Sequence, residues 1–162
     1  MEEKILILDF GSQYTQLIAR RIRELNIYCE IFPFNKIPEI SSEYVGVILS
    51  GSPYSIHDKD SPEINFKTFS NLPVLGICYG AQLIAKENDC VVAKSEIREY
   101  GRAKLSYVNS ESLLMKGVEL NSDVWMSHGD SITEITDSFQ VLASTKDVKI
   151  TSYYLKKKNY FG

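Results

Sequence analysis

The sequence is poor in the residues that form disulfides and metal sites. It has 162 residues, of which three are cysteines and two are histidines. No Cys-x-x-Cys pair occurs, and His57 and His128 are far apart in the chain. An odd number of cysteines without close pairs fits a reducing compartment better than a disulfide framework. We therefore expect no metal site, and we expect Cys29 and Cys90 to be buried structural residues.

The sequence also lacks a large excess of positive or negative charge, and it has no long apolar run. The 18 basic and 21 acidic residues leave a formal net charge of -3, which favours neither a nucleic-acid nor a membrane partner. No apolar run approaches the roughly 20 residues of a membrane-spanning helix. Residues 1–4 lack the basic region and apolar stretch of a secretory signal. These absences predict a cytoplasmic protein.

The length suits one domain with a sizeable core. Hydrophobic residues make up 44% of the chain and charged residues 24%, which are ordinary values for a globular protein. The sequence contains no internal repeat, low-complexity segment or linker. We predict a single domain over residues 1–162.

Patterns typical of buried strands and helices alternate in the first half of the chain. Residues 4–10, 27–32, 45–49 and 74–78 are short apolar runs, as expected for strands covered on both faces. A helix is predicted between the first two, because apolar residues recur there at helical spacing. These residues are Tyr14, Leu17, Ile18, Ile22 and Leu25. A second helix is expected from about Ala81. The alternation predicts an α/β fold with a mostly parallel central sheet flanked by helices.

The second half of the chain has a different pattern. Shorter strands are predicted at 91–93, 103–108, 124–127, 141–145 and 150–154, with turn signals between them. Short strands joined by turns pair in an antiparallel way, so we expect this half to be more antiparallel than the first.

The most informative segment is Gly76-Ile77-Cys78-Tyr79-Gly80, between a predicted strand and a predicted helix. A glycine-flanked strand-to-helix turn is the geometry that exposes the nucleophile of α/β hydrolases, and a thiol fits it as well as a hydroxyl. The helix N-terminus is expected to lower the thiol pKa, and the N–H of Tyr79 can face an oxyanion. The alternative, a buried structural cysteine, does not explain the two glycines. We therefore predict that Cys78 is a nucleophile.

The pattern around Cys78, with Gln82 four residues later, resembles the class I glutamine amidotransferases. The segment Leu49-Ser50-Gly51-Ser52-Pro53 resembles the loop that ends the third strand of that family, whose backbone N–H groups supply the other half of the oxyanion hole. The family usually has Gly-Gly-Pro at this place, and a serine is compatible with a backbone donor.

Three further stretches narrow the resemblance to the GMP synthetase branch of the family. They are residues 8–17 (LDFGSQYTQL), 98–101 (REYG) and 125–130 (WMSHGD). The resemblance is collinear and extends to the last residue.

The resemblance implies a role for each matching residue. Cys78 attacks the glutamine carboxamide, and the backbone N–H groups of Ser52 and Tyr79 hold the oxyanion. Gln82 holds the substrate or its loop. The remaining glutamine-binding residues are Gly51, Ser127, His128, Gly129 and Asp130.

For a few residues the sequence leaves two interpretations open. Asp9 and Ser12 either belong to the site or cap the first helix. His128 contributes either through its backbone to glutamine binding or as a turn residue without a catalytic part. His57 lies in a polar loop and is expected to be solvated.

The resemblance implies hydrolysis of glutamine to glutamate and ammonia through a thioester at Cys78. The ammonia would aminate XMP to GMP on an ATP-pyrophosphatase domain or subunit. No segment resembles a nucleotide-binding loop, so ATP and magnesium are expected on that partner and no cofactor on this domain. The resemblance leaves a homodimer of the full enzyme open. The alternatives are the glutaminase part of another biosynthetic amidotransferase and a non-catalytic regulatory subunit of the same fold.

One expected component is absent from the sequence. The family places a histidine and a glutamate, in a Phe-His-Pro-Glu motif, near the end of the domain, where they activate the thiol and protonate the leaving ammonia. The 162 residues end before such a motif. We expect a fragment of a longer enzyme rather than a naturally short chain, with little or no glutaminase activity by itself.

Overall fold

A computed structural model describes residues 3–162, without the side chains of residues 95–100 and 128. Its strands are β1 (Lys4–Asp9), β2 (Tyr28–Pro33), β3 (Tyr44–Leu49), β4 (Val74–Gly76), β5 (Val91–Val108), β6 (Asp123–Glu134), β7 (Phe139–Thr145), β8 (Ser152–Leu155) and β9 (Tyr160–Phe161). Its helices are α1 (Thr15–Glu24) and α2 (Tyr79–Glu87), with single 3₁₀ turns η1 (Phe66–Phe69) and η2 (Lys156–Lys158). Within the described residues, no helix has the length and hydropathy to cross a membrane.

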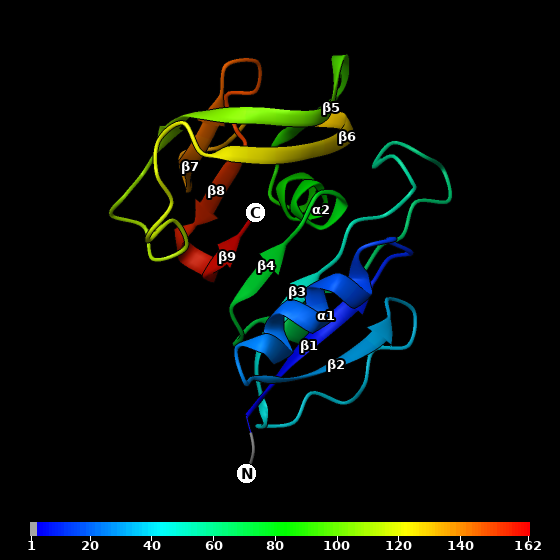
Figure 1. Ribbon diagram of the computed structural model, residues 1–162. Helices are drawn as coiled ribbons and strands as arrows, with labels where there is room; N and C mark the ends of the chain where they lie inside the picture. The colour runs from blue at the N-terminus through cyan, green and yellow to red at the C-terminus, as the bar shows by residue number, and fades with distance from the viewer. Residues whose placement is uncertain (1–2) are drawn as a thin grey trace.

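The strands form one sheet in the order β2-β1-β3-β4-β9-β8-β7-β5-β6 (Figure 1). The strands from β2 to β9 in this order pair in parallel. From β9 onwards every pairing is antiparallel, and β5 and β6 form a long hairpin at the far edge. The expectation of an α/β fold with a mostly parallel central sheet and a more antiparallel C-terminal half is therefore confirmed.

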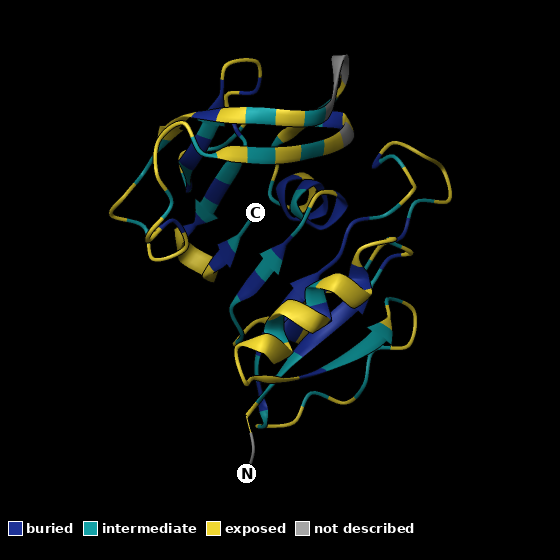
Figure 2. Ribbon diagram, viewed as in Figure 1, coloured by how far each residue is buried: buried dark blue, intermediate teal, exposed yellow. Residues whose placement is uncertain are grey.

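The two helices cover opposite faces of the parallel half. Successive side chains of a strand point to opposite faces, and β1 follows this rule. Ile7 packs in one cluster with Ala19 of α1, whereas Leu6 and Leu8 pack in the main core with Ile84 of α2. Figure 2 shows β1, β3 and much of α2 as buried, whereas exposed and half-buried residues alternate along β5 and β6. The central strands are therefore covered on both faces, as their continuous apolar runs predict.

The helix after β1 is present, but its buried face was only partly predicted. Ile18 and Ile22 do pack against the sheet, whereas Tyr14, Leu17 and Leu25 are exposed. The face in contact with the sheet instead includes Thr15 and Ala19, which are fully buried. Thr15, Ile18, Ala19 and Ile22 follow one another at three- and four-residue spacing, so they form the face that meets the sheet, and Tyr14, Leu17 and Leu25 lie outside it.

The strand bounds of the second half also differ from the prediction. Residues 91–93 and 103–108, expected as two strands, belong to the single 18-residue strand β5. Residues 124–127 are part of the 12-residue strand β6. The polar residues between the predicted pieces do not interrupt a strand here, because the hairpin face is open to water. The family-like stretch 98–101 falls in β5, and the side chains of residues 98–100 lie outside the described residues.

Candidate active site

The turn between β4 and α2 holds Cys78 in an unusual backbone conformation. Cys78 has φ 50° and ψ -110° and directly precedes the first residue of α2. A positive φ is uncommon for a residue with a side chain. A Cβ at Gly76 would lie 2.5 Å from the backbone N of Ala81, and one at Gly80 would lie 2.6 Å from the carbonyl oxygen of Leu49. Both glycines are therefore required by backbone packing, as the sequence pattern predicts.

The carboxyl ends of β1, β3 and β4 meet at this turn. The N–H of Ile77 donates to the carbonyl of Leu49 at 2.9 Å, and the N–H of Gly80 donates to the carbonyl of Ser50 at 3.2 Å. A Cβ on Gly51 would lie 3.6 Å from the Cβ of Cys78, so the loop after β3 runs directly beside the nucleophile turn. Open α/β sheets place their sites at this edge.

Ser50 connects these segments and was not singled out from the sequence. It is fully buried. Its hydroxyl accepts the N–H of Phe10 at 2.9 Å and donates to the carbonyl of Gly51 at 2.8 Å. Ser50 thereby fixes the loop after β3 against the end of β1. Ser50 is followed by Gly51 and Ser52. Small polar residues in a row are common in loops, so no local sequence signal indicates this role.

Two backbone N–H groups near Cys78 are free to bind an oxyanion. Within the described part of the chain, no hydrogen bond uses the N–H of Ser52 or of Tyr79. The Tyr79 side chain is buried, and its hydroxyl donates to the carbonyl of Pro62 at 2.5 Å. The Ser52 hydroxyl accepts the N–H of Tyr54 at 3.2 Å. Both side chains are thus engaged elsewhere, and free donors of this kind are what a tetrahedral oxyanion requires.

The residue Cys78 is exposed, yet the surroundings of its thiol disfavour the thiolate. Surrounding protein atoms remove water from around the sulfur, and this desolvation raises the thiol pKa above its ordinary value of 9.0. The lowered pKa expected from the helix N-terminus is therefore wrong for this chain. Among the residues with described side chains, no lysine, arginine or histidine lines the pockets at Cys78. Without such a neighbour, the thiol needs a base from elsewhere to react quickly at neutral pH.

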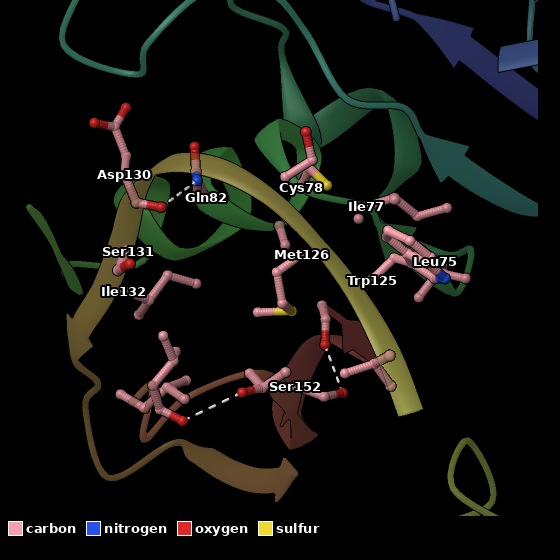
Figure 3. A pocket seen from close by; sticks show the side chains of 18 residues that line it. Leu75, Ile77, Cys78, Gln82, Trp125, Met126, Asp130, Ser131, Ile132 and Ser152 are labelled. Carbon is pink, nitrogen blue, oxygen red and sulfur yellow. Dashed lines mark hydrogen bonds between the residues drawn. The ribbon is translucent and has the colours of Figure 1, made fainter. Parts of the chain in front are cut away.

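Cys78 lies between two pockets. One, of about 320 Å³, is polar and is lined by the loop after β3, by Gln82 and by residues of β6. The other, of about 330 Å³, is mainly apolar and includes Leu75, Met126 and Ile132 (Figure 3). Each volume lies in the range of sites for small ligands. The polar pocket suits an amino acid, since its lining includes the polar side chains of Ser55, Gln82 and Asp130.

Gln82 and Asp130 are brought together in the wall of the polar pocket. The Gln82 side-chain amide donates to the backbone carbonyl of Asp130 at 2.9 Å, as the dashed line in Figure 3 shows. The Asp130 carboxylate, in a residue only 6% exposed, accepts the Ser55 hydroxyl at 2.6 Å and the N–H of Ile56 at 3.3 Å. Gln82 therefore links the first turn of α2 to β6 at the wall of the pocket.

The other residues of the predicted binding stretch lie on β6. Ser127 and Gly129 line the polar pocket with Asp130. His128 pairs with Glu99 of β5 in the strand register, and its side chain lies outside the described residues. The structure thus brings Gly51, Gln82 and the stretch from Ser127 to Asp130 to one place from three separate elements.

The structure also places Asp9, His57 and Cys29. Asp9 Oδ1 accepts the N–H groups of Gly11 and Ser12 and the Thr15 hydroxyl, so it organises the turn into α1. His57 is exposed, and Cys29 is buried and donates to the carbonyl of Ala19. Among the described residues, no group of histidine, cysteine or acidic side chains could hold a metal ion.

Comparison with known proteins gives a consistent result. Residues 6–162 match the family described as glutamine amidotransferase class-I. Two curated relatives are named GMP synthase [glutamine-hydrolyzing]: that of Cytophaga hutchinsonii is 55% identical over 163 residues, and that of Phocaeicola vulgatus is 51% identical over 163 residues. All of the chain is covered in both cases, but it spans only 32% of the length of each relative.

Solved structures share the fold. A structure from Thermoplasma acidophilum, described as one subunit of GMP synthase, has a TM-score of 0.82 and 28% identity, over 99% of this chain and 82% of that one. A glutamine amidotransferase of Thermotoga maritima has a TM-score of 0.78 at 16% identity, over 100% of this chain and 74% of that one.

Proposed function

Since the chain belongs to the class I glutamine amidotransferase family, we propose that it hydrolyses the side-chain amide of glutamine, with Cys78 as the nucleophile. The observation that carries this proposal is the strained turn at Cys78, which lies beside two unused backbone N–H groups and a polar pocket. This combination is what an acyl transfer requires: an exposed nucleophile, oxyanion donors and a place for the substrate.

The chemistry follows from these positions. The Cys78 thiolate attacks the carboxamide carbon, and the developing oxyanion accepts hydrogen bonds from the N–H groups of Ser52 and Tyr79. Collapse of the tetrahedral intermediate expels ammonia once the leaving nitrogen is protonated, and a thioester remains. Water then attacks the thioester, which releases glutamate and restores the thiol.

The polar pocket is the binding site for the amino-acid end of glutamine in this proposal. Asp130 is the sole carboxylate among its described lining residues, and no described cationic side chain lines it. A negative, partly enclosed wall favours the α-ammonium group, while the backbone of Ser127 and Gly129 is available for the α-carboxylate. The glutamine carboxamide then points toward Cys78.

The base and acid of this reaction are proposed to come from outside the 162 residues. Desolvation raises the Cys78 pKa, so burial opposes formation of the thiolate that the reaction needs. A histidine held by a carboxylate, from a further segment or another chain, would supply both proton transfers. We therefore expect the purified 162-residue chain to release little ammonia from glutamine. Release at an ordinary enzyme rate would overturn this part of the proposal.

We further propose that the ammonia serves the amination of XMP to GMP. The support is the name of the curated relatives, which span about three times the length of this chain. ATP and magnesium would bind a synthetase domain or subunit that makes up the rest of such an enzyme. A free nucleophilic thiol is suited to a reducing compartment such as the cytoplasm.

Two electrophiles of equal intrinsic reactivity test the site directly. The chloromethyl ketone analogue of glutamine and chloroacetone carry the same reactive group, but only the first has the amino-acid end. We expect the analogue to alkylate Cys78 faster than chloroacetone, and free glutamine to slow the analogue alone, as measured by peptide mass spectrometry. Equal rates for the two reagents, with no protection by glutamine, would refute glutamine binding at Cys78.

A further inference from the structure

The loop from Ser52 to Asp58 forms one wall of the polar pocket and has no strand or helix of its own. Its backbone carries the oxyanion donor of Ser52, so its position decides whether that N–H faces Cys78. Within the loop, the N–H of Ser55 donates to the Asp58 carboxylate at 2.8 Å, and the N–H of His57 donates to the Ser55 hydroxyl at 3.1 Å. These contacts shape the loop, but they do not attach it to the rest of the site.

Asp130 attaches the loop to β6 and lies 74 and 75 residues away from its two loop partners. A longer bond of 3.4 Å, from the Lys86 ammonium to the carbonyl of Ile56, joins the loop to α2. The Ser55 hydroxyl donates to Asp130 Oδ2 at 2.6 Å, and the N–H of Ile56 donates to the same oxygen at 3.3 Å. Hydrogen bonds to a buried carboxylate are short and about twice as strong as those between neutral groups.

Asp130 also connects to the nucleophile helix. Its backbone carbonyl accepts the Gln82 side chain at 2.9 Å, and the N–H of Gln82 donates to the carbonyl of Cys78 at 3.1 Å. The loop, β6 and the first turn of α2 therefore meet at one buried residue. Of the hydrogen bonds at Asp130, the one from the Ser55 hydroxyl can be removed by a substitution that leaves Asp130 and Gln82 intact.

We propose that Ser55 is a positioning residue for the glutaminase site, and that its bond to Asp130 holds the 52–58 loop so that the pocket has the shape of glutamine. This inference rests on the function proposed above. Ser55 touches neither the thiol nor the reacting carbon, and it acts through the loop that carries Ser52. Loss of the bond leaves the carboxylate with one loop partner, and the pocket wall then samples positions that do not fit the substrate.

A purely structural role makes a different prediction. The loop is also anchored by the Ile56 side chain, which is 1% exposed and belongs to the main core. Removal of the Ser55 hydroxyl should therefore leave the global fold nearly intact while it changes the recognition of glutamine. A structural role alone would lower the stability of the whole chain and leave the preference for the glutamine analogue unchanged.

The test measures the rate of Cys78 alkylation by the chloromethyl ketone analogue of glutamine, divided by the rate with chloroacetone. Because both reagents need the same thiolate, this ratio reports the pocket and not the thiol pKa. We expect Ser55→Ala to lower the ratio about tenfold, on the scale of one charge-assisted hydrogen bond. Ser55→Thr retains the hydroxyl and should stay within about twofold of the unmodified chain.

A matched serine serves as the control. Ser42 is exposed and lies just before β3, at the end of the strand remote from Cys78, so Ser42→Ala should leave the ratio unchanged. In an Asp130→Asn background the acceptor charge is gone, and the effect of Ser55→Ala should shrink if the two residues act together. Amide hydrogen exchange at Ile56 should quicken in Ser55→Ala.

The outcomes separate the two proposals. If the unmodified chain prefers the glutamine analogue and Ser55→Ala keeps that preference, the positioning role is wrong while the glutaminase proposal stands. If the unmodified chain has no preference, glutamine recognition is refuted and the positioning role falls with it. If Ser55→Thr loses the preference as fully as Ser55→Ala, the hydroxyl is not the cause and the proposal is overturned.

Discussion

The parallel and antiparallel halves of the sheet contribute to the site in different ways. In the parallel half, backbone packing fixes the nucleophile, since a Cβ at Gly80 would lie 2.6 Å from both the Cβ and the carbonyl oxygen of Leu49. In the antiparallel half, a Cβ at Gly129 would meet nothing within 4 Å, and Trp125 is 75% exposed. The turn at Cys78 is held by steric exclusion, whereas the pocket wall on β6 is held by a few hydrogen bonds at Asp130 and Gln82. Backbone contacts therefore fix the turn at Cys78, whereas single side-chain substitutions can remove the hydrogen bonds that hold the pocket wall on β6.

The largest expected effect is at the nucleophile itself. Cys78→Ala should abolish incorporation of the glutamine chloromethyl ketone, because no other thiol lies in the polar pocket as described. The matched variant Cys90→Ala removes a half-buried thiol elsewhere and should leave incorporation intact. The measurement is mass spectrometry of the intact chain, and labelling that persists in Cys78→Ala would place the reactive group elsewhere.

A pair of glycine substitutions tests the steric difference between the halves. Gly80→Ala should destabilise the chain by about 3 kcal/mol, because the added methyl group overlaps the end of β3 and the backbone there cannot move freely. Gly129→Ala should change stability by about 0.5 kcal/mol or less, as expected for an open surface position. Urea unfolding measures both. Equal effects of the two substitutions would contradict the contrast between the halves.

The pH dependence of Cys78 alkylation tests whether packing in the parallel half raises the pKa of the thiol. Burial raises the Cys78 pKa above 9.0, so the thiolate fraction of the folded chain should rise about tenfold per pH unit between pH 7 and 9. In the unfolded chain the desolvation is lost and the midpoint should fall toward its ordinary value. Chloroacetone alkylation at each pH, with and without urea, measures the difference. A rate that is already flat at pH 7 would mean that a further group stabilises the thiolate.

The smallest expected effect concerns a hydrogen bond that links the two halves. The hydroxyl of Tyr153 on β8 donates to the carbonyl of Ala81 in α2 at 2.5 Å, in a residue that is 1% exposed. Tyr153→Phe should cost about 1 kcal/mol, since it removes the donor to the part-buried carbonyl of Ala81. Tyr154→Phe is the control, because its hydroxyl makes only a 3.5 Å contact with Asn159. If urea unfolding gives the same stability for both variants, the bond to α2 contributes nothing.

Local patterns explain what was predicted correctly. Continuous apolar runs located β1 and β3 to within a residue or two, since a strand covered on both faces leaves few polar positions. The Gly-x-Cys-x-Gly spacing located the turn at Cys78, because both glycines are required by close backbone contacts. Gly76 meets the turn itself, and Gly80 meets the adjacent strand β3. The helix after β1 was also found, but its buried face was not, since the depth of packing depends on the sheet beneath it.

The sequence by itself determined the alternation of strands and helices in the first half of the chain, the turn at Cys78 and the family of the chain, because each depends on residues close together in the sequence or on similarity to relatives. Only the tertiary structure decided that Ser50 links the loop after β3 to β1, that Ser55 reaches Asp130, and that burial raises the Cys78 pKa. The bond between Ser55 and Asp130 joins residues 75 positions apart, and desolvation comes from every segment packed around the sulfur. Such effects arise from distant parts of the chain, and no local pattern encodes them.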